Sequence, residues 1–159
     1  MTITILCVGK LKESYWTMAV QEYEKRLSKY CLLSISEIKE EKAPSKPSEA
    51  DDEMIKTEEG KSILRQIKSD TYVIACDLKG EQLSSEKMAE KLNLLGLSGK
   101  SNIAFIIGGS LGLSQEVLSR ADFKLSFSKL TFPHQLMRII LLEQIYRSFK
   151  INKNETYHK

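Results

Sequence analysis

A glycine-rich turn at residues 108–112 is the strongest candidate for a ligand-binding segment in this chain. Its sequence is GGSLG, and it directly follows the apolar run 103–107. Three glycines within five residues allow positive φ angles and let a ligand approach the main chain closely. We interpret the turn as one wall of a ligand site, with an ordinary tight turn as the alternative.

Two phosphate-binding fingerprints do not fit this chain. The turn reads G-G-x-x-G rather than G-x-G-x-x-G, and no acidic residue at a strand end follows about 20 residues later. The pair Gly9-Lys10 lacks both the earlier glycine and the following Ser or Thr of a phosphate loop. The sequence therefore disfavours a nicotinamide enzyme or a nucleotide hydrolase, although another α/β cofactor enzyme stays open as an alternative.

Disulfide and metal chemistry are also disfavoured. The three cysteines, Cys7, Cys31 and Cys76, are odd in number and show no C-x-x-C spacing. The two histidines, His134 and His158, do not complete a ligand set. We predict no metal site, and we expect the cysteines to act as small hydrophobic residues.

Alternating strands and helices must position the glycine turn. The apolar patterns predict strands at 2–8, 31–38, 71–78, 103–107 and 123–127, and helices at 14–30, 52–68, 84–96, after Ser114, and at 133–149. This alternation predicts one α/β domain over residues 1–159, with a largely parallel sheet flanked by helices. Ligands bind beyond the carboxyl ends of such strands, so the segments 75–80, 106–112 and 127–134 are the candidate ligand-binding segments.

Composition limits the classes of partner. The chain has 159 residues, 42% of them hydrophobic, and a formal net charge of +3, which permits an RNA partner without demanding one. Neither a signal peptide nor an apolar run of about 20 residues is present, so we predict a cytoplasmic protein without a membrane partner.

Six short segments together resemble the RlmH family of ribosomal RNA methyltransferases in the SPOUT superfamily. They are 8–12 (VGKLK), 22–26 (EYEKR), 105–109 (FIIGG), 125–129 (LSFSK), 131–134 (TFPH) and 157–159 (YHK). Each segment is modest, but their order, spacing and placement at both chain ends make the set specific. The resemblance spans nearly the whole chain.

The resemblance implies a fold, an activity and a cofactor site. It implies a deep trefoil knot near the C-terminus, with the knot and the cofactor site within about 72–159, and a homodimer. The implied activity is methylation of N3 of a pseudouridine in 23S rRNA, from S-adenosyl-L-methionine, on the assembled ribosome. The implied cofactor contacts are Cys76, Gly108, Phe127, Ser128, Lys129, Leu130, Thr131 and Phe132. The family commonly has leucine where this chain has Cys76, a change that a backbone contact would tolerate.

The C-terminal residues are the candidate catalytic groups. The target imide nitrogen is protonated at neutral pH, so a general base or a nearby positive charge must help to remove its proton. The resemblance at the last residues favours His158 as the base, with Tyr157 positioning the base ring or the tail. An ordinary mobile polar tail is the alternative. His134, at a helix start, fits a structural role better.

The last predicted helix is apolar on more than one side. Leu141 and Ile145 lie on one face, whereas Leu136 and Ile140 lie on another. A helix buried on two sides indicates a subunit interface, with a central core helix as the alternative. Arg138 falls within the apolar face, so we predict that a carboxylate or a ligand pairs with it.

Several basic residues near the N-terminus are candidates for rRNA phosphate contacts: Lys10, Lys12, Lys25, Arg26 and Lys29. A solvated helix face is the alternative, and a steep salt dependence of binding would distinguish the two. A non-catalytic ribosome-binding module that kept the fold is the remaining alternative to an enzyme.

Overall fold

Five parallel strands form one sheet in the computed structural model, which describes residues 1–157. The strands are β1 (Thr2–Val8), β2 (Leu32–Ile38), β3 (Tyr72–Gln82), β4 (Asn102–Ile107) and β5 (Phe123–Ser126). Their order across the sheet is β2-β1-β4-β3-β5, and every neighbouring pair is parallel. The predicted parallel α/β sheet is confirmed.

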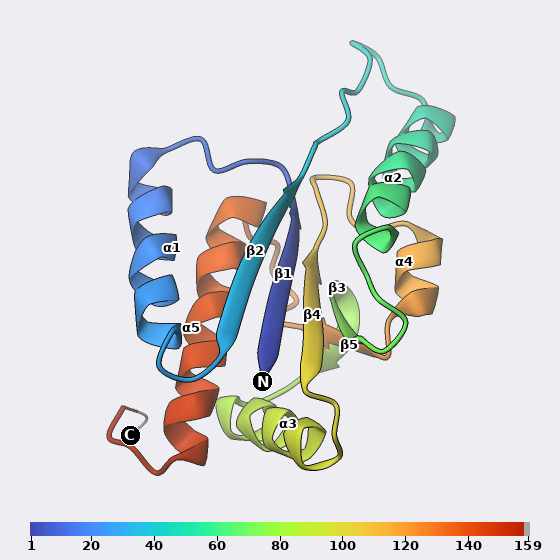
Figure 1. Ribbon diagram of the computed structural model, residues 1–159. Helices are drawn as coiled ribbons and strands as arrows, with labels where there is room; N and C mark the ends of the chain where they lie inside the picture. Colours follow the sequence, from blue (N-terminus) through green and yellow to red (C-terminus); the bar gives the residue numbers. More distant parts are fainter. Residues whose placement is uncertain (158–159) are drawn as a thin grey trace.

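Helices cover both faces of the sheet (Figure 1). They are α1 (Ser14–Leu27), α2 (Glu49–Leu64), α3 (Ser85–Leu97), α4 (Gln115–Arg120) and α5 (His134–Asn152). Helices α1, α3 and α5 lie on one face, with α5 packed against both α1 and α3, and α2 and α4 lie together on the other face. Within residues 1–157, no helix combines the length and apolar character needed to cross a membrane.

Strand alternation divides the core into two clusters. Ile5 and Phe105 point to the α1–α3–α5 side, whereas their neighbours Leu6 and Ile106 point to the α2–α4 side. Successive side chains of a strand face opposite sides of a sheet, so β-strands covered on both faces are apolar at consecutive positions. These buried central strands hold the carboxyl edge of the sheet, where the site lies, in fixed geometry.

Serine caps set three of the helix starts. Ser114 caps α4 as predicted, and Ser84, one of the two candidates Ser84 and Ser85, caps α3. Helix α2 begins at Glu49, earlier than the predicted start at residue 52, because Ser48 and Asp51 form a capping box: the Asp51 N–H donates to Ser48 Oγ (3.2 Å) and the Ser48 N–H donates to Asp51 Oδ2 (2.8 Å).

Strand β3 runs further than predicted. Leu125 of β5 is in register with both Cys76 and Glu81, so the intervening residues form a bulge, and the strand ends at Gln82 rather than near residue 78. Gly80 lies so close to β5 that a Cβ there would meet the Lys124 carbonyl oxygen at 2.6 Å. The predicted strand end near residue 78 is therefore wrong, because residues 77–80 form this bulge and pairing with β5 resumes at Glu81.

Candidate functional site

The sheet register brings the predicted cofactor segments together at the carboxyl edge. Cys76 is in register with Ile107 on one side and with Leu125 on the other. Gly108 directly follows Ile107, and Phe127 comes two residues after Leu125. Segments far apart in the sequence therefore meet around the middle of β3.

The glycine turn after β4 closes tightly on itself. The Gly112 N–H donates to the Gly109 carbonyl (3.1 Å), and the predicted positive φ occurs at Gly112, with a value of 84°. A Cβ at Gly108 would lie only 2.8 Å from the carbonyl carbon and oxygen of Gly112. The first glycine is thus required by the close approach of the turn's own backbone.

A cavity of about 260 Å³ lies beside β5 and α5. Its apolar lining includes Phe127, Phe132 and Ile140, and its polar lining includes Ser126 and Gln144. Two of the predicted cofactor contacts, Phe127 and Phe132, line this cavity. The lining does not include the other six, which are Cys76, Gly108, Ser128, Lys129, Leu130 and Thr131.

The loop between β5 and α5 carries most of the predicted cofactor contacts. Ser126 Oγ donates to the Ser128 carbonyl (3.1 Å), and the Leu130 N–H donates to Ser128 Oγ (3.0 Å). These bonds fix the first half of the loop. The Leu130 side chain is 70% exposed, so this loop presents an apolar group to solvent.

The two cysteines at this edge, Cys7 and Cys76, are a buried and a half-buried free thiol. Burial raises the pKa of Cys76 to about 12 and the pKa of Cys7 to about 11, so both remain thiols at neutral pH. Both side chains pack in the apolar cluster under α5, as expected for small hydrophobic residues. Within residues 1–157, no group of three or more His, Cys, Asp or Glu side chains could hold a metal ion.

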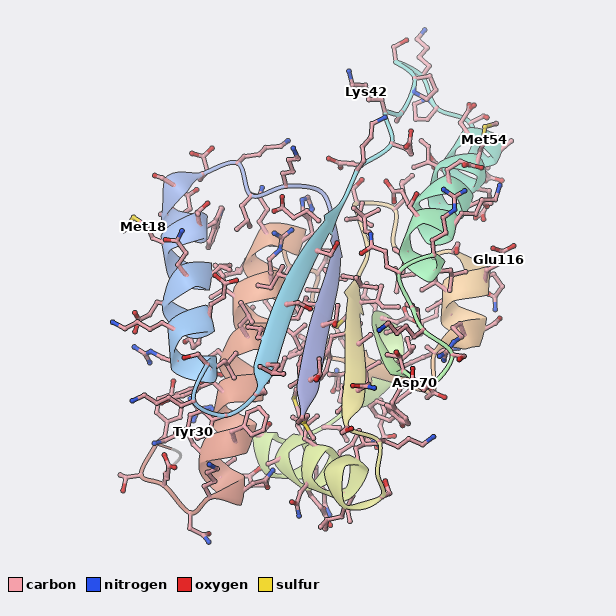
Figure 2. All side chains as sticks on the ribbon, in the orientation of Figure 1. Met18, Tyr30, Lys42, Met54, Asp70 and Glu116 are labelled. Carbon is pink, nitrogen blue, oxygen red and sulfur yellow. The ribbon has the colours of Figure 1, made fainter. Side chains whose placement is uncertain are left out.

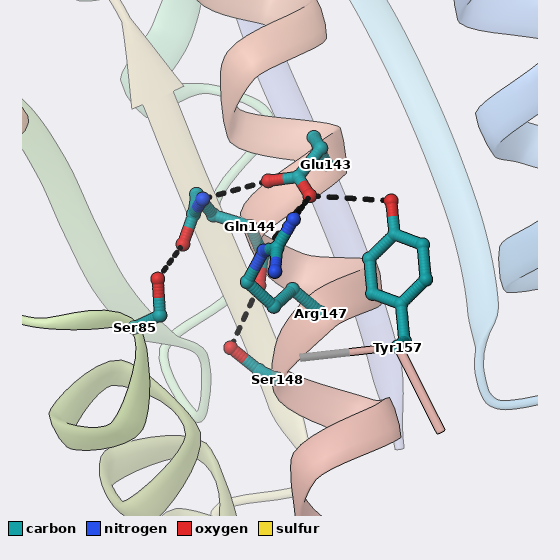
Figure 3. Close-up of polar contacts among 6 residues, drawn as sticks. All are labelled: Ser85, Glu143, Gln144, Arg147, Ser148 and Tyr157. Carbon is teal, nitrogen blue, oxygen red and sulfur yellow. Dashed lines mark hydrogen bonds and ion pairs between the residues drawn. The ribbon is translucent and has the colours of Figure 1, made fainter. Parts of the chain in front are cut away.

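A chain of hydrogen bonds leads from the cavity to the C-terminal segment (Figure 3). Ser85 Oγ donates to Gln144 Oε1 (2.8 Å), and Gln144 Nε2 donates to Glu143 Oε2 (2.6 Å). Glu143 Oε1 accepts from Arg147 Nε (2.9 Å), from Arg147 Nη2 (2.6 Å) and from the Tyr157 hydroxyl (3.3 Å). The Glu143 carboxylate therefore joins the cavity wall to Tyr157.

Tyr157 is also packed by its neighbours. Its ring meets the edge of Tyr146 at 4.9 Å, and the Arg147 guanidinium lies 4.8 Å from its centroid. Burial, and then the nearby Tyr157 and Glu143, raise the pKa of Tyr23 to about 12, so the Tyr23 hydroxyl keeps its proton at neutral pH. The predicted base, His158, and Lys159 lie outside the described residues 1–157.

Arg138 has the carboxylate partner that its sequence context predicts. The side chain is 1% exposed; Nη1 donates to Glu37 Oε1 (2.7 Å) and Nη2 donates to the Gly9 carbonyl (3.0 Å). Its buried Nε has no hydrogen-bond partner among residues 1–157. Arg138 thus fixes α5 to the carboxyl ends of β1 and β2. A Cβ at Gly9 would lie 3.4 Å from His134 Nε2, so His134 packs at the same junction.

The five predicted phosphate-contacting residues do not form one surface. Lys10 and Lys12 precede α1, whereas Lys25, Arg26 and Lys29 lie at its far end. A helix of this length separates the two groups by about 20 Å. Figure 1 shows the two ends of α1 on opposite sides of the molecule's α1–α5 layer. The five candidates therefore belong to two separate basic regions.

Comparison with protein families identifies the class. A family model described as a predicted SPOUT methyltransferase matches residues 1–158. The chain therefore belongs to the SPOUT methyltransferase family.

Curated relatives narrow this class. The protein named ribosomal RNA large subunit methyltransferase H of Clostridium novyi (strain NT) is 63% identical over 159 residues, and the proteins of the same name from Clostridium kluyveri and Alkaliphilus oremlandii are 60% identical. Each alignment covers 100% of both chains. Within the SPOUT family, the chain belongs to the ribosomal RNA large subunit methyltransferase H family, as the six short segments predict.

A solved structure supports the fold independently. The probable methylase family protein from Haemophilus influenzae Rd KW20 superposes with a TM-score of 0.55 at 15% identity. The superposition covers 99% of this chain and 70% of that protein. At this identity the similarity concerns the arrangement of helices and strands alone.

Proposed function

We propose that this protein transfers a methyl group from S-adenosyl-L-methionine to N3 of a pseudouridine in 23S rRNA, acting on the assembled ribosome. Full-length identity of about 60% to proteins named ribosomal RNA large subunit methyltransferase H supports an rRNA substrate. The observation that carries the proposal is the hydrogen-bond chain from the cavity at α5 to Tyr157. This hydrogen-bond chain connects a cavity suited to a cofactor with the C-terminal segment that is predicted to position the target base and accept its proton.

The cavity fits the cofactor by its chemistry. Phe127, Phe132 and Ile140 offer apolar walls for an adenine ring, while Ser126 and Gln144 offer polar groups for the amino acid part. When bound, the cofactor supplies a methyl group activated by a sulfonium. We propose that Phe127 and Phe132 hold the cofactor within the cavity, and that Cys76, Gly108, Ser128, Lys129, Leu130 and Thr131, which lie outside its lining, complete the cofactor site.

The chain's own residues orient the base and hold the proton. Glu143 and Arg147 fix Tyr157, and His158 follows Tyr157 directly. We propose that the His158 imidazole accepts the N3 proton and that Tyr157 positions the tail or the target ring. Orientation of the nucleophile contributes much of the rate in such transfers, so a fixed tail has a direct catalytic use.

Three further features complete the proposal. Helix α5 packs against both α1 and α3 within the chain, which favours the alternative of a central core helix over the predicted subunit interface. The exposed apolar side chains of Tyr15 (57%) and Met18 (66%) on α1 instead support a surface covered by a second copy in a homodimer. We propose that the chain forms a trefoil knot within about 72–159, the region that also supplies the cofactor contacts. A ribosomal substrate would place the protein in the cytoplasm.

Mass spectrometry of 23S rRNA tests the activity. In a strain lacking the gene, we expect one pseudouridine to lose its N3 methyl group, and a plasmid copy of the gene to restore it. An unchanged methylation state would contradict the proposal and favour a non-catalytic ribosome-binding module. Calorimetric titrations with S-adenosyl-L-methionine and with NAD distinguish the proposed methyltransferase from another α/β cofactor enzyme. We expect heat of binding with S-adenosyl-L-methionine and none with NAD.

A further inference from the structure

A second pocket, of about 410 Å³, lies where the C-terminal ends of α1 and α5 come together. It is separate from the cavity beside β5, and none of its lining residues is among the predicted cofactor contacts. Four cations, two tyrosines and one carboxylate line it: Arg26, Lys29, Lys150, Lys153, Tyr30, Tyr146 and Glu155.

One wall of this basic pocket already binds an anionic group. Glu155 Oε2 accepts from the Tyr30 hydroxyl (2.6 Å) and is paired with Lys150 Nζ. These hydrogen bonds from Lys150 and Tyr30 lower the pKa of Glu155, so its carboxylate is ionised at neutral pH. The pocket therefore contains a position where two donors hold an oxyanion that belongs to the chain itself.

The pocket keeps an excess of positive charge. Arg26 is paired with Glu22 (2.7 Å), and Lys150 is paired with Glu155. Lys29 and Lys153 have no ion pair within residues 1–157. Two ammonium groups thus remain available for a ligand of negative charge.

Aromatic rings lie among these cations. The Tyr30 ring is stacked on Phe149, with centroids 5.6 Å apart, and Lys153 Nζ lies 5.0 Å from the Tyr30 centroid. The Arg26 guanidinium lies 5.8 Å from the Tyr146 centroid. Cations interleaved with aromatic rings are typical of sites for single-stranded nucleic acid.

The basic pocket adjoins the predicted catalytic segment. Tyr146 contacts both the Tyr30 ring and the Tyr157 ring, at 5.8 Å and 4.9 Å. Glu155 precedes Tyr157 by two residues, and its N–H donates to the Lys150 carbonyl (2.9 Å). An RNA strand bound in the pocket would therefore pass close to Tyr157.

We propose that this pocket binds a backbone phosphate of the rRNA strand that carries the target nucleotide, and that Glu155 occupies the phosphate position in the free protein. The inference rests on the proposed function. A phosphate oxygen can accept from Lys150 and Tyr30 in place of the carboxylate, while Lys29 and Lys153 supply further positive charge. Cations near helix C-termini also stabilise helix dipoles, but that role alone would leave RNA affinity unchanged when they are removed.

Binding of ribosomes from a strain lacking the gene tests the pocket. The variants are the double substitution Lys29→Ala with Lys153→Ala, and separately Glu155→Gln. Matched controls are Lys42→Ala with Lys46→Ala, and Glu116→Gln. Lys42 and Glu116 lie far from Tyr30 (Figure 2). Dissociation constants are measured by filter binding over a range of KCl concentrations, and circular dichroism checks that each variant is folded.

We expect the double lysine variant to bind ribosomes about tenfold more weakly and to lower the slope of log K against log salt by about 0.7, the contribution of one phosphate contact on a single strand. Glu155→Gln is expected to bind about twofold to threefold more tightly, because the competing charge is removed. The control variants are expected to change affinity by less than about twofold.

Two results would overturn the inference. Equal losses in the pocket and control variants would show that only net charge matters. A weaker affinity with an unchanged salt slope would indicate contact with a ribosomal protein rather than with phosphate. Failure of the proposed function is distinguishable, because wild-type protein would then fail to bind S-adenosyl-L-methionine or to methylate these ribosomes, whatever the pocket variants do.

Discussion

Replacing Gly108 by alanine tests whether the glycine turn forms one wall of the cofactor site. A Cβ there would lie 2.8 Å from the carbonyl carbon and oxygen of Gly112, and 3.1 Å from Leu113 Cδ2. Rotation of a side chain cannot relieve a contact with backbone, so the turn must move by several tenths of an ångström. Overpacking of this kind costs about 1–3 kcal/mol, and we expect the free energy of unfolding to fall by about 2 kcal/mol.

The same displacement should weaken the cofactor site. We expect the dissociation constant for S-adenosyl-L-methionine to rise by at least tenfold, which corresponds to about 1.4 kcal/mol. Gly96→Ala is the matched control: it lies in α3, where the nearest atom to a new Cβ is the flexible Met1 Cε at 3.3 Å. Helix propensity favours alanine there by up to about 1 kcal/mol, so this variant should be at least as stable as the wild type.

Urea unfolding at one fixed protein concentration and calorimetric titration measure the two effects. A fixed concentration is needed because dimerisation would make the apparent stability depend on it. A Gly108→Ala protein with wild-type stability and wild-type affinity for the cofactor would refute the reasoning. Lower stability with unchanged affinity for the cofactor would show that the turn is important for packing but is not part of the cofactor site.

Three further perturbations probe other parts of the structure. Arg138→Met should lower the free energy of unfolding by about 2–4 kcal/mol, because it removes the hydrogen bonds from the buried guanidinium to Glu37 and to the Gly9 carbonyl. A loss below about 0.5 kcal/mol in urea unfolding would contradict this. Glu143→Gln should lower kcat at least tenfold, because it weakens the contact that holds Tyr157 in place. The dissociation constant for the cofactor should change by less than about twofold. An unchanged kcat would show that Glu143 has no role in positioning Tyr157 for the reaction. Burial of the Glu59 side chain raises the pKa of its carboxyl in the folded protein above the ordinary value of 4.5. The stability that protonated Glu59 contributes is therefore fully present below pH 4.5 and is lost as pH rises through the folded-state pKa. Thermal unfolding should therefore show that the stability of Glu59→Gln relative to the wild type increases as pH rises from 4 to 7. A difference that stays constant with pH would contradict a raised pKa for Glu59.

Local patterns predict the helices and strands well because their causes are local. Apolar runs marked the five strands, and Ser84 and Ser114 marked two helix starts, as the structure confirms. The extension of β3 to Gln82 was missed because the segment contains a glycine and several polar residues. Only its pairing with β5 makes it a strand, and that contact is invisible in the local sequence.

Side-chain partners are harder to predict than elements. The sequence requires a partner for the buried Arg138, but Glu37 lies 101 residues away and is one of 21 acidic residues. The sequence does not single out Glu143 and Arg147, because an acid and a base four residues apart resemble an ordinary exposed pair on a helix. Their contact with Tyr157 depends on how the chain returns after α5.

The basic pocket is a further site whose residues lie far apart in the sequence and come together only in the fold. Arg26 and Lys29 were identified as candidates for phosphate contacts, but Lys150 and Lys153 were not, because more than 100 residues separate the two pairs. The packing of α1 against α5 unites them. Charge counted along the sequence could not indicate this convergence.

Transfer of a labelled methyl group to intact ribosomes tests the central proposal most directly. Ribosomes from a strain lacking the gene are incubated with the purified protein and S-adenosyl-L-methionine carrying a trideuterated methyl group, and the 23S rRNA is then digested and analysed by mass spectrometry. The account predicts one trideuterated methyl group on N3 of a pseudouridine. Label on another nucleotide, or no label with a protein that binds the cofactor, would contradict it.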